Sequence, residues 1–74
     1  QIAGLNSGFT EIIERKKDIN CVSFWYYEGT NLLAVDAINT PKDYMIGKRL
    51  LENKISPKKE IVKDPTKNLK DLIT

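Results

Sequence analysis

The sequence predicts a single α+β domain: an antiparallel β-sheet with a central hairpin, packed by one main helix and a short helical C-terminal tail. Three observations support this fold class. The first half of the 74 residues is rich in strand patterns, the second half carries helix-start signals, and no internal repeat or long linker divides the chain. We therefore expect residues 1–74 to share one small core, because a chain of this length buries only about 60% of its unfolded surface.

Strands are expected to account for most of the first half. The expected strands cover residues 2–5, 9–15, 20–27 and 31–38, with turns at 6–8, 16–18 and 28–30. The last two strands should pair as an antiparallel hairpin in which Gly29 supplies a positive φ. Large side chains alternate across both faces of residues 20–27, so we expect both faces of this strand to be at least partly covered.

The main helix is expected to begin after Thr40 and to run to about Asn53. The Thr40 side chain can accept hydrogen bonds from exposed backbone N–H groups, Pro41 suits the first helical position, and Asp43 lies near the positive end of the macrodipole. Gly47 lies beside the apolar stripe of this helix, where glycine costs roughly 1 kcal/mol relative to alanine unless close packing requires it. We therefore interpret Gly47 as a contact point with the sheet.

Two proline pairs punctuate the tail that follows this helix. Each pair, at residues 56–57 and 64–65, is a serine or aspartate followed by proline. This pattern is typical of a helix cap followed by a first-turn proline. The tail is thus expected to form one or two short turns or helices that end near Leu72 and Ile73.

The composition excludes several kinds of site. The chain has no histidine and only one cysteine, Cys21, so neither a zinc site nor a histidine acid/base pair can be assembled and no intrachain disulfide can form. The mid-strand position of Cys21 beside bulky residues favours an inert, buried thiol. No apolar run approaches the roughly 20 residues that cross a bilayer, and no secretory signal opens the sequence, so we expect a cytoplasmic protein. The apolar opening without an initiator methionine predicts a fragment of a longer chain.

No cluster of residues in the sequence indicates an active site. Asp36 lies in an otherwise apolar strand, and the N–H groups of the helix start at 40–42 could satisfy its carboxylate, so we favour a structural role for it over a catalytic one. No glycine-rich fingerprint follows a strand, so this chain cannot cradle a dinucleotide pyrophosphate in the manner of a Rossmann domain. We therefore expect no catalytic, cofactor-binding or metal-binding residues here.

Two surfaces leave alternative functions open. The net charge of +2 hides a basic second half, in which nine lysines and arginines oppose five acidic residues, but a solvated surface is its simplest explanation. The aromatic run at 24–27 could stack bases, yet no basic residue occurs between Asp18 and Lys42. We favour core packing for Phe24 and Tyr26, with Trp25 or Tyr27 facing a neighbouring domain. A free-standing module that binds single-stranded nucleic acid or protein, and a dimer, remain alternatives.

Several stretches together carry a family resemblance. They are Phe24-Trp25-Tyr26-Tyr27-Glu28-Gly29, the run from Leu32 to Pro41, Asp43-Tyr44, Gly47-Lys48-Arg49-Leu50, and the opening Ile2-Ala3-Gly4-Leu5 with Gly8-Phe9. The sequence resembles the C-terminal domain of bacterial FAD-dependent ferredoxin and rubredoxin reductases. The run from Ala34 to Pro41 is the most specific part of this resemblance, which covers nearly the whole chain.

The resemblance implies an electron-transfer reaction. Enzymes of this family pass hydride from NADH or NADPH to FAD and then pass single electrons to a ferredoxin or rubredoxin. The FAD and the nicotinamide are held by upstream domains that are absent here, so the resemblance implies that this chain alone is inactive. Its implied role is to cover the flavin side and to help dock the acidic acceptor through basic residues of the tail, Lys70 above all and also Lys67.

Overall fold

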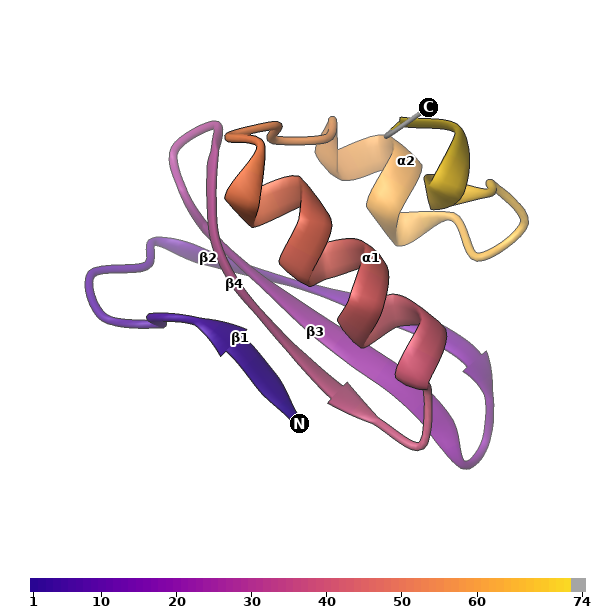
Figure 1. Ribbon diagram of the computed structural model, residues 1–74. Coiled ribbons are helices and arrows are strands. Elements are labelled where there is room, and N and C mark those ends of the chain that lie inside the picture. The colour runs from indigo at the N-terminus through magenta and orange to yellow at the C-terminus, as the bar shows by residue number, and fades with distance from the viewer. Residues whose placement is uncertain (73–74) are drawn as a thin grey trace.

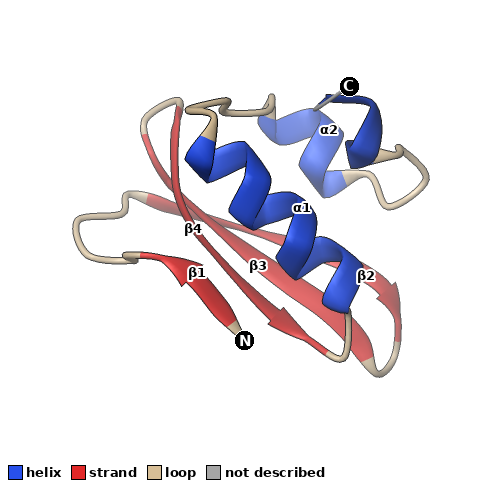
Figure 2. Ribbon diagram, in the orientation of Figure 1, coloured by secondary structure: helices blue, strands red, loops and turns tan. Residues whose placement is uncertain are grey.

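The computed structural model describes residues 1–72 and consists of one antiparallel sheet with helices packed on one of its faces (Figure 1). The elements in chain order are β1 (Ile2–Gly4), β2 (Glu11–Asp18), β3 (Cys21–Glu28), β4 (Asn31–Ile38), α1 (Pro41–Glu52), α2 (Lys59–Lys63) and a 3₁₀ helix, η1 (Leu69–Leu72). The four strands lie in the order β1-β4-β3-β2, so β1 and β2 form the edges. Figure 2 shows the strand layer and the helix layer, and the predicted α+β class is confirmed.

The central hairpin forms as predicted. β3 and β4 pair antiparallel, with Trp25 opposite Val35, and Gly29 in the connecting turn has a φ of 59°. The expected turn at residues 16–18 is wrong, because β2 continues through Lys16 to Asp18 and the chain turns at residues 19–20 instead. β2 is an edge strand, where charged side chains are tolerated and discourage pairing with other chains.

The face assignment of the aromatic strand is the reverse of the one expected. Trp25 and Tyr27 are fully buried beneath the helices, whereas Phe24 and Tyr26 lie on the opposite, open face and are half-buried. Both faces carry large side chains, so the alternation alone could not show which face the helices would cover. Within residues 1–72, helices cover only one face of the sheet.

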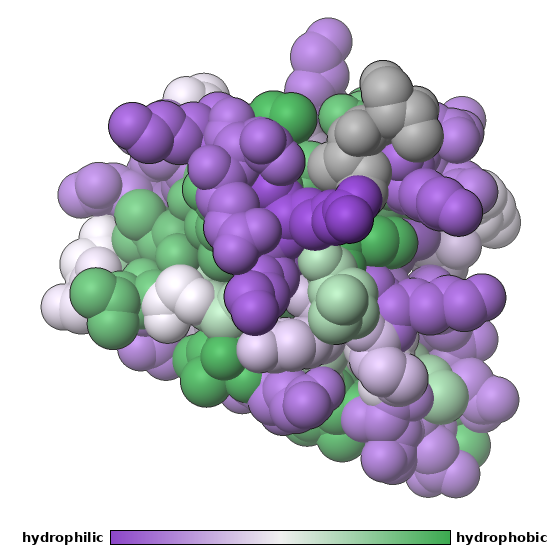
Figure 3. All heavy atoms as spheres, viewed as in Figure 1, coloured by the Kyte–Doolittle hydropathy of each residue, from purple (hydrophilic) through white to green (hydrophobic). Residues whose placement is uncertain are grey.

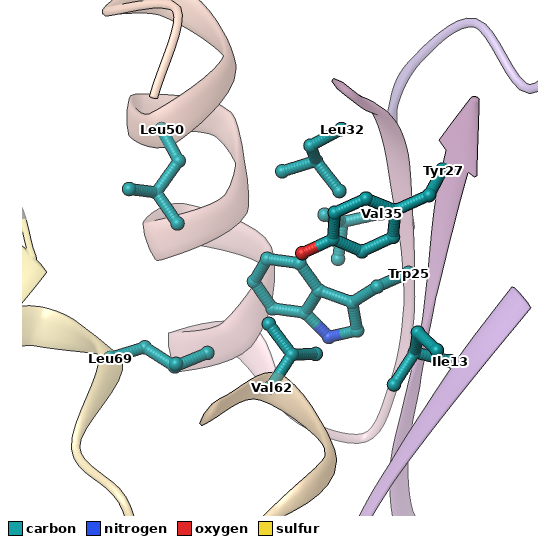
Figure 4. Packing of buried hydrophobic residues seen from close by; sticks show 8 residues of the cluster. All are labelled: Ile13, Trp25, Tyr27, Leu32, Val35, Leu50, Val62 and Leu69. Carbon is teal, nitrogen blue, oxygen red and sulfur yellow. The ribbon is translucent and has the colours of Figure 1, made fainter. Parts of the chain in front are cut away.

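The core is a single cluster around an indole ring. Figure 4 shows the Trp25 side chain surrounded by residues from both layers. The cluster consists of Ile13, Trp25, Tyr27, Leu32, Val35, Leu50, Val62 and Leu69. Because α1, α2 and η1 each contribute a side chain, the tail is part of the core and not an appendage.

Gly47 is the contact point between α1 and the sheet, as predicted. A Cβ atom built on Gly47 would lie only 2.6 Å from Val35 Cγ2 and 2.9 Å from Val35 Cβ. Val35 is fully buried and β-branched, so it cannot rotate away at low cost. The missing side chain at Gly47 therefore sets how closely α1 approaches β4.

The start of α1 differs from the expected cap. Pro41 occupies the first turn as predicted, but the Thr40 side chain makes no capping hydrogen bond. The backbone carbonyl of Thr40 instead accepts from the N–H groups of Asp43 and Tyr44, at 3.1 and 3.2 Å. The expectation of a side-chain cap at Thr40 is therefore wrong, because the buried Thr40 residue serves the helix through its main chain.

The first proline pair fastens the tail to the sheet and does not cap a helix. The Ser56 hydroxyl accepts from the backbone N–H of Leu32 at 2.9 Å, and the Tyr27 hydroxyl donates to the Pro57 carbonyl at 2.6 Å. Burial raises the pKa of Tyr27, so its phenol stays protonated as a donor. α2 begins only at Lys59, which places the expected cap two residues too early.

The second proline pair forms a turn and does not cap a helix either. An Asp64 carboxylate oxygen accepts from both the backbone N–H and the hydroxyl of Thr66, at 3.0 and 2.7 Å. No helix starts at Pro65, so the cap expected there is wrong. The final helical turn, η1, runs to Leu72, while Ile73 lies outside the described residues.

A chain of buried polar groups joins α1 to the sheet. The Trp25 indole N–H donates to the Ser23 hydroxyl at 2.8 Å, and this hydroxyl donates to Asp43 Oδ2 at 2.7 Å. Lys17 Nζ lies 3.2 Å from Asp43 Oδ1, and Arg15 Nε lies 3.9 Å from Asp43 Oδ2. The Asp43 side chain is 2% exposed, so these partners compensate the removal of its carboxylate from water.

Replacing Gly47 with alanine is expected to destabilise the domain. Overpacking against Val35 costs roughly 1–3 kcal/mol, which we expect to exceed the ~1 kcal/mol gain in helix propensity. Urea unfolding measures the difference. Lys48→Ala, at the exposed neighbouring position, is the matched control, and a Gly47→Ala protein more stable than the wild type would contradict the close approach.

Replacing Ser23 with alanine is expected to cost roughly 1–3 kcal/mol of unfolding free energy. The substitution leaves the buried Trp25 N–H without its acceptor and removes one donor from Asp43. Urea unfolding followed by tryptophan fluorescence measures the loss. Ser7→Ala, in an exposed loop, is the control, and equal stability of the two variants would show that the polar chain contributes nothing.

Candidate functional site

A groove runs between α1 and the segment that follows α2, with a volume of about 810 Å³. Its charged lining consists of one carboxylate, Asp43, and six cations: Arg15, Lys17, Lys42, Arg49, Lys67 and Lys70. The cations come from β2, from α1 and from the tail, which are distant in sequence and meet only in the folded chain. The structure therefore concentrates positive charge in one place.

Four of these cations are free to meet a partner. Lys42, Arg49, Lys67 and Lys70 are exposed and form no ion pair within residues 1–72. The other two are committed, because Lys17 pairs with Asp43 and Arg15 is buried. Seen from the side on which the helices lie, the surface is largely hydrophilic (Figure 3).

The two lysines predicted for docking lie on the same rim of the groove. Lys67 follows the turn that Asp64 organises, and its N–H donates to the Asp64 carbonyl at 3.1 Å. The hydrogen bonds from Thr66 hold the pKa of Asp64 below its ordinary value, so the turn keeps its carboxylate form at neutral pH. The Lys70 N–H donates to the Asn68 side chain at 3.1 Å, which starts η1. Both lysines thus project from ordered backbone.

The groove also offers apolar contact. Pro41, Met45, Ile46 and Pro65 line it alongside the charged residues, and Met45 is 56% exposed. Protein interfaces commonly combine an apolar centre with a polar rim, and methionine and arginine are enriched in them. The groove has the mixed character of a protein-docking surface.

Asp36 lies away from the groove. Its backbone is paired with Phe24 on β3 and Ile2 on β1, and its half-buried side chain shares the open face with these residues. The helix start supplies it with no hydrogen bond, so the expected donors at 40–42 are wrong. The carboxylate that the first turn of α1 buries is Asp43, which belongs to the helix itself.

Arg15 is the residue that sequence reasoning missed. Its side chain is 2% exposed and reaches the floor of the groove. A signal was available, because Arg15 is two positions after Ile13 and shares the face of β2 that enters the core. Burial lowers the pKa of Arg15 and the nearby Asp43 and Asp64 oppose that shift, while the guanidinium remains charged at any working pH.

The open face of the sheet is a second candidate surface, and it carries exposed apolar side chains beside the charged Glu14, Lys16 and Asp36. Ile2, Phe9, Ile12 and Ile38 are each more than 40% exposed, and the ring of Phe9 contacts that of Tyr26 edge to face, with centroids 5.2 Å apart. Soluble monomers rarely expose large contiguous apolar patches, and such patches mark interaction sites. This face is suited to packing against another protein surface.

Other kinds of site find little support in the described residues. No group of three or more cysteine, aspartate or glutamate side chains within residues 1–72 could hold a metal ion. None of the helices in this part of the chain is long and apolar enough to cross a membrane. Cys21, expected to be buried, is half-buried at the start of β3. The groove lysines and the exposed aromatic rings lie on different surfaces, which disfavours the alternative of a nucleic-acid module.

Comparison with known proteins identifies the relatives of this fold. The family model described as "Reductase C-terminal" matches residues 1–73. Rhodocoxin reductase from Rhodococcus erythropolis is 31% identical over 71 residues, which are 95% of this chain and 17% of that protein.

Two solved structures superpose closely on the domain. A ferredoxin reductase from Rhodopseudomonas palustris has a TM-score of 0.92 at 24% identity, over 99% of this chain and 18% of that one. The covalent putidaredoxin reductase–putidaredoxin complex has a TM-score of 0.89 at 27% identity, over 97% and 18%. The chain thus spans only 17–18% of the length of these relatives. It belongs to the Reductase C-terminal family, the C-terminal domain of ferredoxin reductases.

Proposed function

We propose that this chain is the non-catalytic C-terminal domain of a cytoplasmic, FAD-dependent NAD(P)H:ferredoxin or rubredoxin oxidoreductase. In the parent enzyme it covers the flavin side and forms part of the surface on which the electron acceptor docks. The observation that carries the docking role is the basic groove with Lys67 and Lys70 on one rim. A further support is that one similar structure is a reductase joined to putidaredoxin, an electron-transfer partner.

Unpaired cations suit the docking of an acidic electron carrier. Complementary charges across an interface raise the association rate and make it sensitive to salt, while contributing less to the lifetime of the complex. An electron carrier must dock and leave in every turnover, so fast and reversible association is what it requires. The exposed rim lysines provide such attraction, because they form no competing ion pair within residues 1–72.

The exposed apolar side chains on the open face of the sheet fit the covering role. The relatives are more than five times longer than this chain, and in the proposed parent the additional chain binds FAD and the nicotinamide nucleotide. The exposed side chains of Ile2, Ile12 and Ile38 would be buried against that part of the enzyme. The groove lies on the helix side of the sheet and stays available to an acceptor.

Reversing the charge of both rim lysines, as Lys67→Glu with Lys70→Glu in the full-length reductase, is expected to lower kcat/KM for the ferredoxin-type acceptor about tenfold at low salt. The difference should shrink as salt screens the interaction. Stopped-flow reduction of the acceptor measures it, relative to the reduction of ferricyanide. Lys54→Glu with Lys58→Glu, two exposed lysines outside the groove, is the control. Equal kcat/KM in both double variants would refute the docking role.

The isolated 74-residue chain is expected to bind no FAD, because in the proposed parent enzyme the flavin is held by other domains. Equilibrium dialysis against FAD, read by flavin absorbance, tests this. The full-length protein should be yellow and should oxidise NAD(P)H. Stoichiometric flavin on the short chain would show that the division of roles between the domains is wrong.

A further inference from the structure

The guanidinium of Arg15 donates its hydrogen bonds to main-chain carbonyls of the tail. Nη1 donates to the carbonyls of Ile61, Val62 and Asp64 at 3.3, 3.0 and 2.8 Å, and Nη2 donates to the Lys67 carbonyl at 2.5 Å. All four acceptors are main-chain oxygens that lie 46–52 residues further along the chain. One strand side chain thus fixes the path of the whole segment from α2 to the groove rim.

Val62 and Leu69 anchor the two ends of the segment in the core, and between them its hydrogen bonds to the rest of the described domain all come from Arg15. α2 has five residues, far fewer than a helix needs to be stable by itself, and the carbonyls at its end have no partners within the helix. Arg15 satisfies these carbonyls and then reaches Lys67, the first of the two rim lysines. Leu69, buried in the core cluster, provides the next point of attachment before Lys70.

Arg15 is itself held in place from the sheet side. It extends from β2 between Ile13 and Lys17, and its Nε lies 3.9 Å from the Asp43 carboxylate without forming a hydrogen bond. Asp43 in turn is fixed by Ser23 and Lys17. The guanidinium therefore holds the tail in a fixed position relative to the sheet.

We infer that Arg15 is a positioning residue for acceptor docking, which holds the Asp64–Lys70 segment so that Lys67 and Lys70 stand together on the groove rim. This inference rests on the proposed function. A cation can assist docking by direct contact with the acceptor or by positioning the residues that make this contact. Lys67 and Lys70 would meet the acceptor directly, whereas Arg15 acts through the backbone and stays buried.

Arg15→Lys in the full-length reductase is the decisive variant, because lysine keeps the charge but loses the planar fork of donors. We expect the KM for a ferredoxin-type acceptor to rise about tenfold while kcat changes little, since docking and not electron transfer is impaired. Amide hydrogen exchange at residues 61–70 should become faster. Ferricyanide turnover reports the state of the flavin. Lys54→Met and Arg15→Met each remove one positive charge. A higher acceptor KM for Arg15→Met but not for Lys54→Met is expected, because only Arg15 holds the tail.

Asn68→Ala keeps the inference testable if the Arg15 variants fail to fold. The exposed Asn68 side chain accepts one hydrogen bond within residues 1–72, from the Lys70 N–H, so its loss disturbs the rim and spares the core. We expect a higher acceptor KM from this variant also. If the double lysine reversal weakens acceptor reduction but Arg15→Lys and Asn68→Ala leave the KM at the wild-type value, the positioning role is overturned and the docking role stands. If the lysine reversal has no effect, the docking role itself fails.

Discussion

The placement of one charged side chain, the guanidinium of Arg15, constrains the rest of this domain. A buried arginine is tolerated only where its donors and its charge are matched, and removing one partner of such a pair commonly costs about 3–5 kcal/mol. Here the match requires Asp43 from the first turn of α1 and four carbonyls from the tail. The sheet, the helix and the tail must therefore assemble together, and a partly docked tail would leave a charge without compensation in a nonpolar interior.

The same constraint shapes the surface. Packing the tail over β2 brings Lys67 and Lys70 opposite Lys42 and Arg49 of α1, and the one carboxylate in the groove is already engaged. Four of the nine basic residues in the second half of the sequence thereby line a single groove, where their charges add to one local positive field. The open face, with its exposed isoleucines, lies on the other side of the sheet, so the two surfaces do not compete for one partner.

Local rules predicted the elements whose determinants are local. The hairpin at Gly29 and the close approach at Gly47 follow from conformations and contacts that glycine alone permits. The burial of Trp25 in place of Phe24 could not be predicted, because both faces of β3 carry aromatic rings and only the helix layer distinguishes them. The alternation with Ile13 indicates that Arg15 is buried, but its acceptors could not be predicted, because they are main-chain oxygens some fifty residues away that leave no mark in the side-chain pattern. The lysines of the groove rim were predicted through a family resemblance. The position of Lys42 and Arg49 beside them could be seen only in the folded structure.

The attachment of the tail through main-chain oxygens has a consequence for how such domains diversify. Arg15 recognises carbonyl groups, which every amino acid possesses, so its hydrogen bond at position 67 places almost no demand on the side chain there. The exposed side chain at this point of the groove rim can therefore change while the main-chain anchorage is kept. Under the proposed docking role, a domain anchored in this way could be adapted to a different partner by substitutions at the groove rim, without a change in the packing beneath it.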